Sequence, residues 1–289
     1  MFALTELHIP PAMGVGLILV VFGLLMGALT IVKRTWSMHP EVPRKCTHVV
    51  MGLVALPIPW LFDSVVPVAV LGCLSFAFLM LLRFAARRNC ELGNILHWSN
   101  ERRASIGDLV FPIAILTMYC LANADPILYC LPLLYLTFSD PFACFVGMRF
   151  SRIESAKRGK QKTMEGSFAF FLATFAMTIG TLLGFTDIDA VTVILVALVA
   201  GAVLSVVEAI STKGADNITV PMFGYLVLSI TLSLDTFQLI ELVSLPALVA
   251  CVFQLCRLWT GLMQPVVTVK RHTPSAFTVP SSIGDHGSS

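Results

Sequence analysis

Long apolar runs divide the charged residues of this chain into short clusters. The run from 166 to 185, for example, holds no Asp, Glu, Lys or Arg. Only 12% of the residues are charged and 57% are hydrophobic, whereas about a quarter of a soluble domain is charged. A helix needs roughly 20 apolar residues to cross the hydrocarbon core of a bilayer. The pattern therefore predicts an all-α, polytopic transmembrane helical bundle.

Nine apolar segments are candidate spans, near residues 13–32, 46–62, 65–82, 106–122, 126–148, 166–185, 190–210, 219–234 and 243–263. The second contains Pro57 and Pro59, which predicts a kink or an incomplete crossing. The ninth contains Arg257, an unfavourable residue within a span. We expect residues 1–264 to form one transmembrane domain. Residues 265–289 are rich in Ser, Thr, Gly and Pro, which predicts a disordered tail.

The distribution of cations predicts the orientation. All nineteen Lys and Arg residues fall in or beside alternate loops. The other loops carry acids without cations: Asp63, Asp125, Asp187, Asp189, Asp235 and Glu241. The positive-inside rule then places the N-terminus outside and the C-terminus in the cytosol. We expect the endoplasmic reticulum membrane in a eukaryotic host and the inner membrane in a bacterial one.

Most polar side chains that could do chemistry lie at the cytosolic ends of the predicted spans. Cations suit a polyphosphate, and carboxylates suit a divalent metal that bridges its oxygens. A transporter would keep charges near the bilayer midplane, where this pattern places none. The candidates are Arg44, Lys45, His48, Arg102, Arg103, Asp108, Asp140, Lys160, Lys162, Glu165, Glu208, Asp216 and Asn217.

The segment "SDPFACFVGMRFS" places Asp140, Ala143 and Gly147 at steps of three and four, so they share one face of a helix. A carboxylate in an apolar span is costly unless it has a partner. We therefore expect a metal or nucleotide role for Asp140. Ala143 and Gly147 fit either a nucleotide site or the packing of small residues between helices.

The segment "KRGKQKTMEG" at 157–166 is a cationic loop that leads directly into an apolar run. Gly159 gives the loop backbone freedom, and Lys160 and Lys162 supply point charges for phosphates. For Lys157 and Arg158 we favour a topology signal or contact with anionic lipid headgroups. Glu165 either acts in catalysis or favours the start of a helix.

The segment "PRKCTHVVMG" places Arg44, His48 and Gly52 four residues apart, hence on one helical face. Arg44 and Lys45 are either phosphate ligands or topology signals. His48 is either an acid–base group or a polar group bonded between helices.

The segment "VVEAISTKGADNITVP" places Glu208 inside an apolar helix, with Asp216 and Asn217 in the loop that follows. An Asp-Asn pair near Gly often forms only a turn. Together with Glu208 the pair can also supply oxygen ligands to a metal. We prefer the metal site, because Glu208 is otherwise hard to explain in an apolar helix.

In this order the segments resemble the polyprenol kinase family, which includes dolichol, phytol and farnesol kinases and the CTP-dependent diacylglycerol kinase. "RKCTHVVMG" is similar to an early Arg-Lys-x-x-His element, and "GDLVFP" to a Gly-x-x-x-Phe-Pro element. "SDPFACFVGMRFS" followed by "KQKTMEGS" resembles the signature assigned to CTP binding. "VEAISTKGADNITVP" resembles a late Glu…Asp-Asn-x-x-x-Pro element. Ser139, Ser151 and Gln161 depart from the family pattern, and the likeness covers roughly residues 41 to 225.

The resemblance implies a kinase that transfers the γ-phosphoryl group of CTP, with Mg2+, to a membrane-embedded isoprenoid alcohol of the dolichol, phytol or farnesol type. The implied catalytic residues are His48, Asp140, Lys162 and Glu165. The implied nucleotide contacts are Arg44, Lys45, Ala143, Gly147, Lys160, Thr163, Gly166 and Asn217. The implied metal ligands are Asp140, Glu208 and Asp216.

Four alternatives stay open. The chain could be the diacylglycerol kinase of the same family. It could be a cytidylyltransferase that makes a CDP-lipid, although the Gly-His-Gly-Gly…Asp-Arg element of CDP-diacylglycerol synthases is absent from the sequence. A transporter and an inactive scaffold are the other two. We expect membrane lipids as partners and no nucleic acid.

Overall fold

The computed structural model describes residues 10–35, 41–87, 107–122, 125–150, 162–211 and 214–244. All regular structure in these ranges is helical, as predicted. In chain order the helices are α1 (Pro11–Thr35), α2 (Glu41–Ala55), α3 (Ile58–Leu61), α4 (Val65–Arg87), α5 (Gly107–Ala122), α6 (Pro126–Leu134), η2 (Tyr135–Ser139), α7 (Asp140–Phe150), α9 (Met164–Phe185), α10 (Ala190–Ile210), α11 (Asp216–Thr231) and α12 (Thr236–Ser244).

Within the described residues, four helical stretches are long and apolar enough to cross a membrane: Pro11–Leu29, Pro126–Phe150, Met164–Phe185 and Ala190–Ile210. The apolar stretches Val65–Leu81 and Leu109–Ala122 are shorter. These helices support a membrane protein, while the nine spans and the orientation stay predictions. Most of the ninth candidate span and the whole tail lie outside the described residues.

The predicted interruption of the second candidate span is confirmed. Helix α2 ends at Ala55, and the single-turn α3 begins at Ile58 after a turn that contains Pro57. Proline cannot continue the hydrogen-bond ladder of a helix, and its ring restricts the residue before it. The segment is therefore two helices rather than one.

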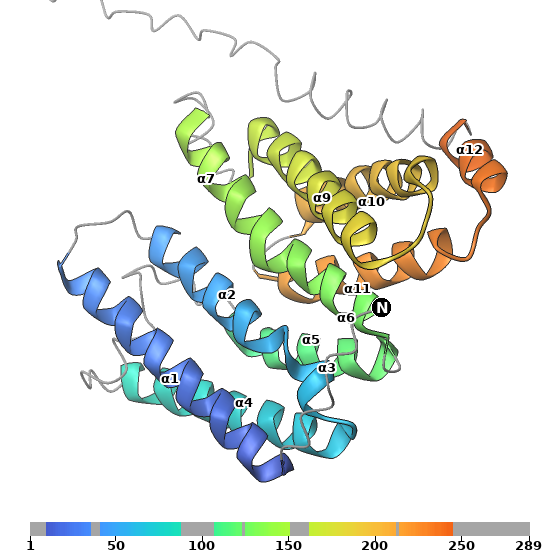
Figure 1. The fold of residues 1–289 in the computed structure, drawn as a ribbon. Coiled ribbons are helices and arrows are strands. Elements are labelled where there is room, and N and C mark those ends of the chain that lie inside the picture. The colour runs from blue at the N-terminus through green and yellow to red at the C-terminus, as the bar shows by residue number, and fades with distance from the viewer. Residues whose placement is uncertain are drawn as a thin grey trace, which may run out of the picture.

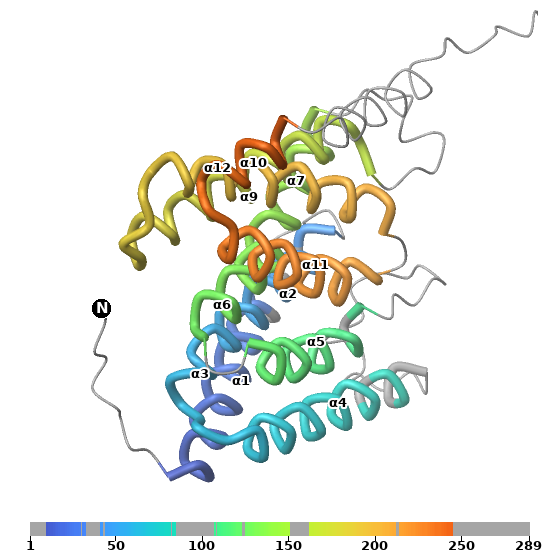
Figure 2. The backbone as a smooth tube through the Cα atoms, turned by 90° about the vertical axis from the view of Figure 1, so that its right-hand side faces the viewer, coloured from blue at the N-terminus to red at the C-terminus, as the bar shows by residue number. Residues whose placement is uncertain are grey.

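The helices form two groups that meet along α6, η2 and α7 (Figure 1). Helix α1 packs on α2, and α4 packs on α5, which in turn packs on α11. On the other side α9 packs between α7 and α10. The same arrangement is visible from the side, where α11 lies next to α5 (Figure 2). One apolar core includes Phe111 and Leu136, and a second includes Tyr135 and Phe170.

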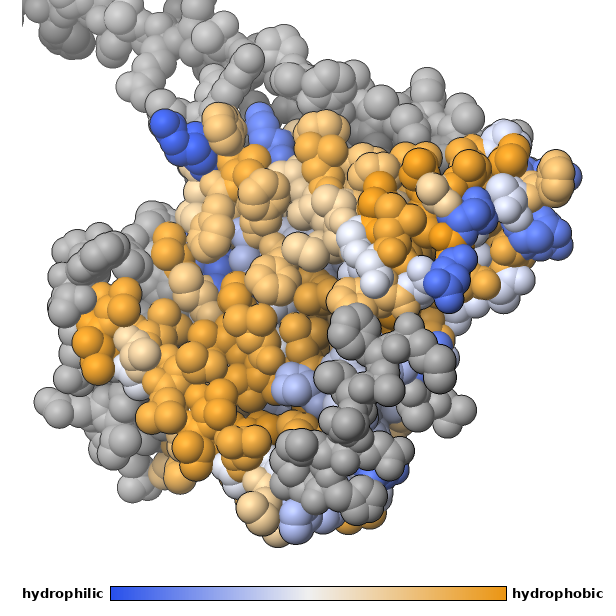
Figure 3. Space-filling model, in the orientation of Figure 1, coloured by the Kyte–Doolittle hydropathy of each residue, from blue (hydrophilic) through white to orange (hydrophobic). Residues whose placement is uncertain are grey.

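Much of the surface is apolar. Space-filling atoms of the α1 side form a broad hydrophobic face (Figure 3). Large apolar side chains are well exposed on several helices, such as Leu24 of α1 at 69% and Val66 of α4 at 68%. Exposed apolar faces of this extent mark interaction surfaces, including those that contact lipid. The surface agrees with the spans found from helix length and composition.

A π-helical turn, η2, joins α6 to α7 within one continuous helix. The backbone N–H of Asp140 donates to the carbonyl of Tyr135, five residues earlier. The next residue, Pro141, has no N–H and would place its ring against the carbonyl four residues before it. A wider turn relieves that conflict, and single π turns are frequent at functional sites. Asp140 is thus the first residue after an irregular turn.

Two close helix contacts depend on glycine. A Cβ on Gly52 of α2 would lie 1.9 Å from Oγ1 of Thr137 in η2. A Cβ on Gly147 of α7 would lie 2.8 Å from Oγ1 of Thr163, and Gly166 of α9 packs against the same place. Because no side chain intervenes, α2 and α9 both approach the helix that carries Asp140.

Candidate active site

A buried ion pair joins α2 to α7. The Nζ atom of Lys45 lies 2.5 Å from Oδ2 of Asp140, and both side chains are 4% exposed. Burial lowers the pKa of Lys45, but the nearby Asp140 carboxylate raises it, and the net pKa lies above the usual value. A buried carboxylate needs such a partner, because an uncompensated charge in an apolar interior is costly.

Asp140 lies deeper in its helix than its predicted place at the end of a span. Ten residues separate it from Phe150, the last residue of the apolar stretch, which corresponds to about 15 Å along the helix axis. Its side chain nevertheless reaches a cation, because Gly52 lets α2 pack directly against η2.

A second lysine holds two more acids. The Nζ atom of Lys162 lies 2.8 Å from Oε1 of Glu208 and 3.7 Å from Oδ2 of Asp216. It also donates to the backbone carbonyl of Glu208. Gly214, with φ of 86°, forms the turn between α10 and α11, a conformation that glycine adopts readily. The turn brings Asp216 back beside the end of α10, where Glu208 lies.

His48 lies between the Lys45–Asp140 pair and the apolar core. It is 2% exposed on α2, and its ring centroid lies 6.2 Å from that of Phe111 in α5. Electrostatic interactions link Asp140 to His48 and to Lys162 as well as to Lys45.

Glu208 interacts electrostatically with both Asp140 and Asp216. One charged cluster thus gathers side chains from α2, α7, α10 and α11, together with Lys162, which lies two residues before α9 begins. The structure brings six predicted residues together in it: Lys45, His48, Asp140, Lys162, Glu208 and Asp216. Their chemical roles stay predictions.

Two uncharged polar side chains beside the charged cluster have no hydrogen-bond partner within the described part of the chain. Asn217 follows Asp216 and is fully buried, and neither amide atom is bonded. Ser139 precedes Asp140 and is likewise buried, with an unbonded hydroxyl. Buried polar groups are almost always bonded, so each exception needs an explanation. A polar ligand at the cluster would supply the missing partners.

The donor chemistry fits a divalent cation, although the protein alone does not complete a site. Among the described residues no three His, Cys, Asp or Glu side chains stand close enough to hold a metal. Glu208 and Asp216 both face one position, which the Lys162 ammonium occupies. Mg2+ commonly uses only one or two carboxylates together with substrate phosphates. A metal role for Glu208 and Asp216 would therefore require oxygens from a bound phosphate, and it stays a prediction.

The remaining predicted residues lie elsewhere or have another evident task. Arg44 interacts electrostatically with Asp140, but its ion pair is with Glu41 of its own helix at 2.7 Å, and it stays partly exposed. Glu165 is exposed in the first turn of α9. Thr163 caps α9 by accepting from the N–H of Gly166 at 3.1 Å.

Ala143 is buried in the contact between α7 and α9 that Gly147 and Gly166 also form. Packing is enough to explain these three small residues, and a nucleotide contact there stays a prediction. Lys160, Arg102 and Arg103 lie outside the described residues, as does the side chain of Asp108.

Sequence reasoning gives too little weight to Lys45 and Ser139. Lys45, His48 and Gly52 occur at i, i+3 and i+7, which is the spacing of one helical face. If the helical face is counted from Lys45 rather than from Arg44, Lys45 shares the buried face of α2 with His48 and Gly52. Ser139 stands out in the sequence only as a departure from the family pattern, and no sequence signal indicates its burial.

Fold and site together define a helical membrane protein with a buried cluster of cations and carboxylates. No protein-family model matches the chain, and no solved structure matches it. Among curated proteins, it is similar to the phytol kinase of Synechocystis sp. (strain ATCC 27184 / PCC 6803 / Kazusa). The two are 26% identical over 221 residues, which cover 76% of this chain and 91% of the relative. This match confirms the resemblance to the polyprenol kinase family that the motifs predicted.

Proposed function

We propose that this protein is a membrane kinase that transfers the γ-phosphoryl group of CTP to an isoprenoid alcohol. The observation that carries the proposal is the charged cluster, in which Lys45 and Lys162 are held by three carboxylates from separate helices. Similarity to a phytol kinase over most of the chain supports the same class of reaction. The positive-inside pattern supports a site that faces the cytosol.

The cluster has the charges that phosphoryl transfer requires. The reaction depends mainly on alignment and on neutralising the phosphate oxygens. Lys45 and Lys162 would exchange their carboxylate partners for phosphate oxygens when the nucleotide binds. Glu208 and Asp216 would then hold Mg2+, which supplies charge neutralisation on the phosphates when it is bound. Asn217 and Ser139, each beside an acid, would donate or accept hydrogen bonds to the same ligand.

His48 is the better placed of the two predicted bases. It lies within electrostatic reach of Asp140, whereas Glu165 is exposed at the start of α9. In the proposed step the alcohol oxygen attacks the γ-phosphorus and its proton passes to His48. The bond between the γ-phosphorus and the bridging oxygen breaks, and CDP leaves. The Asp140 carboxylate, which interacts electrostatically with His48, would stabilise the resulting imidazolium.

The choice of CTP rests on the family resemblance, because the lysines and carboxylates would contact only the phosphates and the metal ion, which all nucleoside triphosphates share. The decisive experiment therefore compares donors as well as acceptors. Purified protein in lipid nanodiscs is incubated with Mg2+ and γ-labelled CTP, ATP, GTP or UTP. Phytol, farnesol, dolichol and diacylglycerol are the acceptors. A parallel reaction uses α-labelled CTP, and Asp140→Asn serves as the inactive control.

Transfer of the γ-label from CTP to an isoprenoid alcohol, absent in Asp140→Asn, is the expected result. Transfer of the α-label instead, with release of pyrophosphate, would identify a cytidylyltransferase. Label in diacylglycerol alone would identify a diacylglycerol kinase rather than a kinase of isoprenoid alcohols. If no lipid gains label from any nucleotide, the kinase proposal fails.

A further inference from the structure

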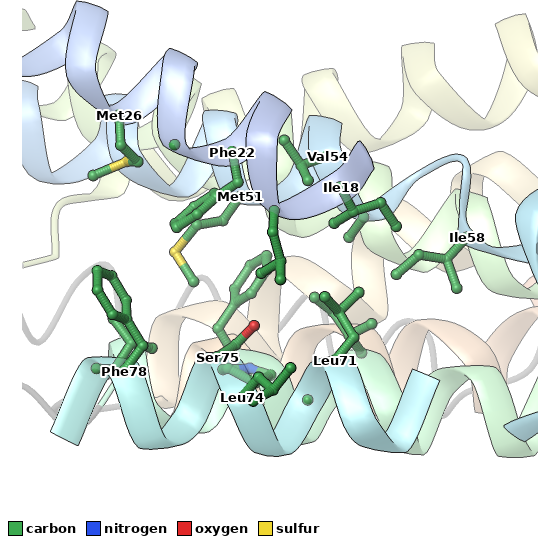
Figure 4. A pocket seen from close by; sticks show the side chains of 18 of the residues that line it. Ile18, Phe22, Met26, Met51, Val54, Ile58, Leu71, Leu74, Ser75 and Phe78 are labelled. Carbon is green, nitrogen blue, oxygen red and sulfur yellow. The ribbon is translucent and has the colours of Figure 1, made fainter. Parts of the chain in front are cut away.

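An apolar pocket of about 650 Å³ lies between α1, α2, α4 and α5. Side chains from opposite walls point toward one another across it, with Phe22 and Met26 on α1 and Leu71 and Phe78 on α4 (Figure 4). Ser75 supplies the one polar side chain among the lining residues that the structure describes. The pocket is thus built to hold a hydrocarbon, within the size range of small-molecule sites.

The pocket runs from an exposed rim to a buried floor. At the rim, Leu74 and Phe78 of α4 are 47% and 49% exposed. At the floor, Met51 of α2 is 8% exposed and Phe111 of α5 is 1% exposed. The rim belongs to the apolar surface that would contact lipid tails. A molecule dissolved in the bilayer could therefore enter sideways, between α1 and α4.

The floor of the pocket adjoins the charged cluster. Phe111 lines the pocket and also contacts the ring of His48. Met51 follows His48 by three residues on α2, so the two side chains are neighbours on one helical face. A hydrocarbon that fills the pocket would therefore have its inner end beside the histidine of the proposed reaction.

We propose that this pocket binds the hydrocarbon chain of the acceptor alcohol, with its hydroxyl directed past Phe111 to His48. The inference rests on the proposed function and adds the location and size of the acceptor. Water occupies about 30 Å³ in the liquid, and a methylene group is of similar size. The pocket therefore has room for one chain of about twenty carbon atoms. The two tails of a diacylglycerol, or a full dolichol chain, would extend beyond it.

Glycines provide variants that fill the pocket without disturbing the backbone. Gly23 of α1 and Gly72 of α4 both line the pocket. A Cβ at Gly23 would meet nothing within 4 Å, and one at Gly72 would meet only the carbonyl of Pro112 at 3.9 Å. Gly16 is the matched control, because it lies on α1 outside the pocket and its Cβ would also meet open space.

The first readout is binding, and it does not depend on activity. A twenty-carbon isoprenoid alcohol that carries a diazirine is photolysed with the wild type, Gly23→Leu/Gly72→Leu and Gly16→Leu in nanodiscs, and labelled peptides are identified by mass spectrometry. Each leucine adds four carbon atoms to the pocket, and each methylene displaced from a ligand weakens binding about fourfold. We expect labelling of α1 and α4 to fall at least about tenfold in the double variant. It should stay within about twofold of wild type in Gly16→Leu.

The second readout is a series of acceptors of five, ten, fifteen and twenty carbons. In the double variant, kcat/KM should fall most for the longest acceptors and least for the five-carbon one. Equal kcat/KM ratios at every length, or undiminished photolabelling, would overturn the pocket assignment while leaving the kinase intact. Equal competition by phosphatidylcholine would show a pocket for bulk lipid and overturn it too. If the wild type phosphorylates none of these acceptors, the proposed function is overturned instead.

Discussion

The buried pair of Lys45 and Asp140 offers the sharpest test of the structure. Its side chains are each 4% exposed, with 2.5 Å between the charged atoms. Removal of one member of a buried pair leaves an uncompensated charge and typically costs about 3–5 kcal/mol. We therefore expect Lys45→Met to lower the free energy of unfolding by about that amount at neutral pH.

The double variant Lys45→Met/Asp140→Val removes both charges. Replacement of a buried ion pair by apolar residues is often neutral or stabilising, so most of the lost stability should return. Phosphoryl transfer should be absent from the single and the double variants alike, because both lack a group of the proposed site. Stability and activity would thus respond differently to the second substitution.

Unfolding in mixed micelles titrated with sodium dodecyl sulfate measures the stability, and γ-labelled nucleotide measures the activity. In Lys45→Met the deficit should also shrink toward low pH, because a protonated Asp140 needs no cation. A single variant within about 1 kcal/mol of wild type at neutral pH would refute the buried pair. Recovery of activity in the double variant would refute its role in the reaction.

Three further predictions concern other parts of the site. Lys162→Ala should reduce kcat/KM for nucleotide by about a hundredfold or more, since it removes a proposed phosphate ligand, whereas Lys157→Ala should change it less than about threefold. Small, equal effects would favour a topology role for both. Without ligand, Asn217→Leu should be as stable as wild type, because the Asn217 amide has no hydrogen-bond partner among the described residues. The variant should nevertheless lose activity. A marked loss of stability would indicate that the amide has a structural role instead. Gly52→Ala should lower the stability of the protein, because the added methyl group clashes with Thr137. Combining it with Thr137→Gly should restore stability and activity together. Absence of this rescue would argue against the close contact of α2 with η2.

The features that sequence predicts best are local. The break at Pro57 can be predicted because proline disrupts the helical turn in which it lies. The apolar runs predict membrane helices because their length and composition match the hydrocarbon core of a bilayer. The need of Glu208 for a partner is recognisable for a similar reason, since an acid in an apolar helix is costly unless it is paired, and the structure pairs it with Lys162. Each inference depends on neighbours in the chain.

Long-range partners are what the sequence conceals. Lys45 lies 95 residues before Asp140, and Lys162 lies 46 residues before Glu208. A lysine at the end of an apolar run is equally compatible with contact to water and with a buried pair. The outcome depends on Gly52 and Thr137, whose close approach brings α2 against η2. Neither residue signals that contact by itself.

The π turn before Asp140 has a consequence for the whole long helix. A wide turn of this kind inserts one residue, and one residue rotates an α-helix by about 100°. The face that α6 presents to α5 and α11 is therefore out of phase with the face that α7 presents to α2 and α9. A single rod can in this way line up with two different sets of neighbours. Deletion of one residue from 135–139 would restore a uniform twist and swing Asp140 about a quarter turn away from Lys45.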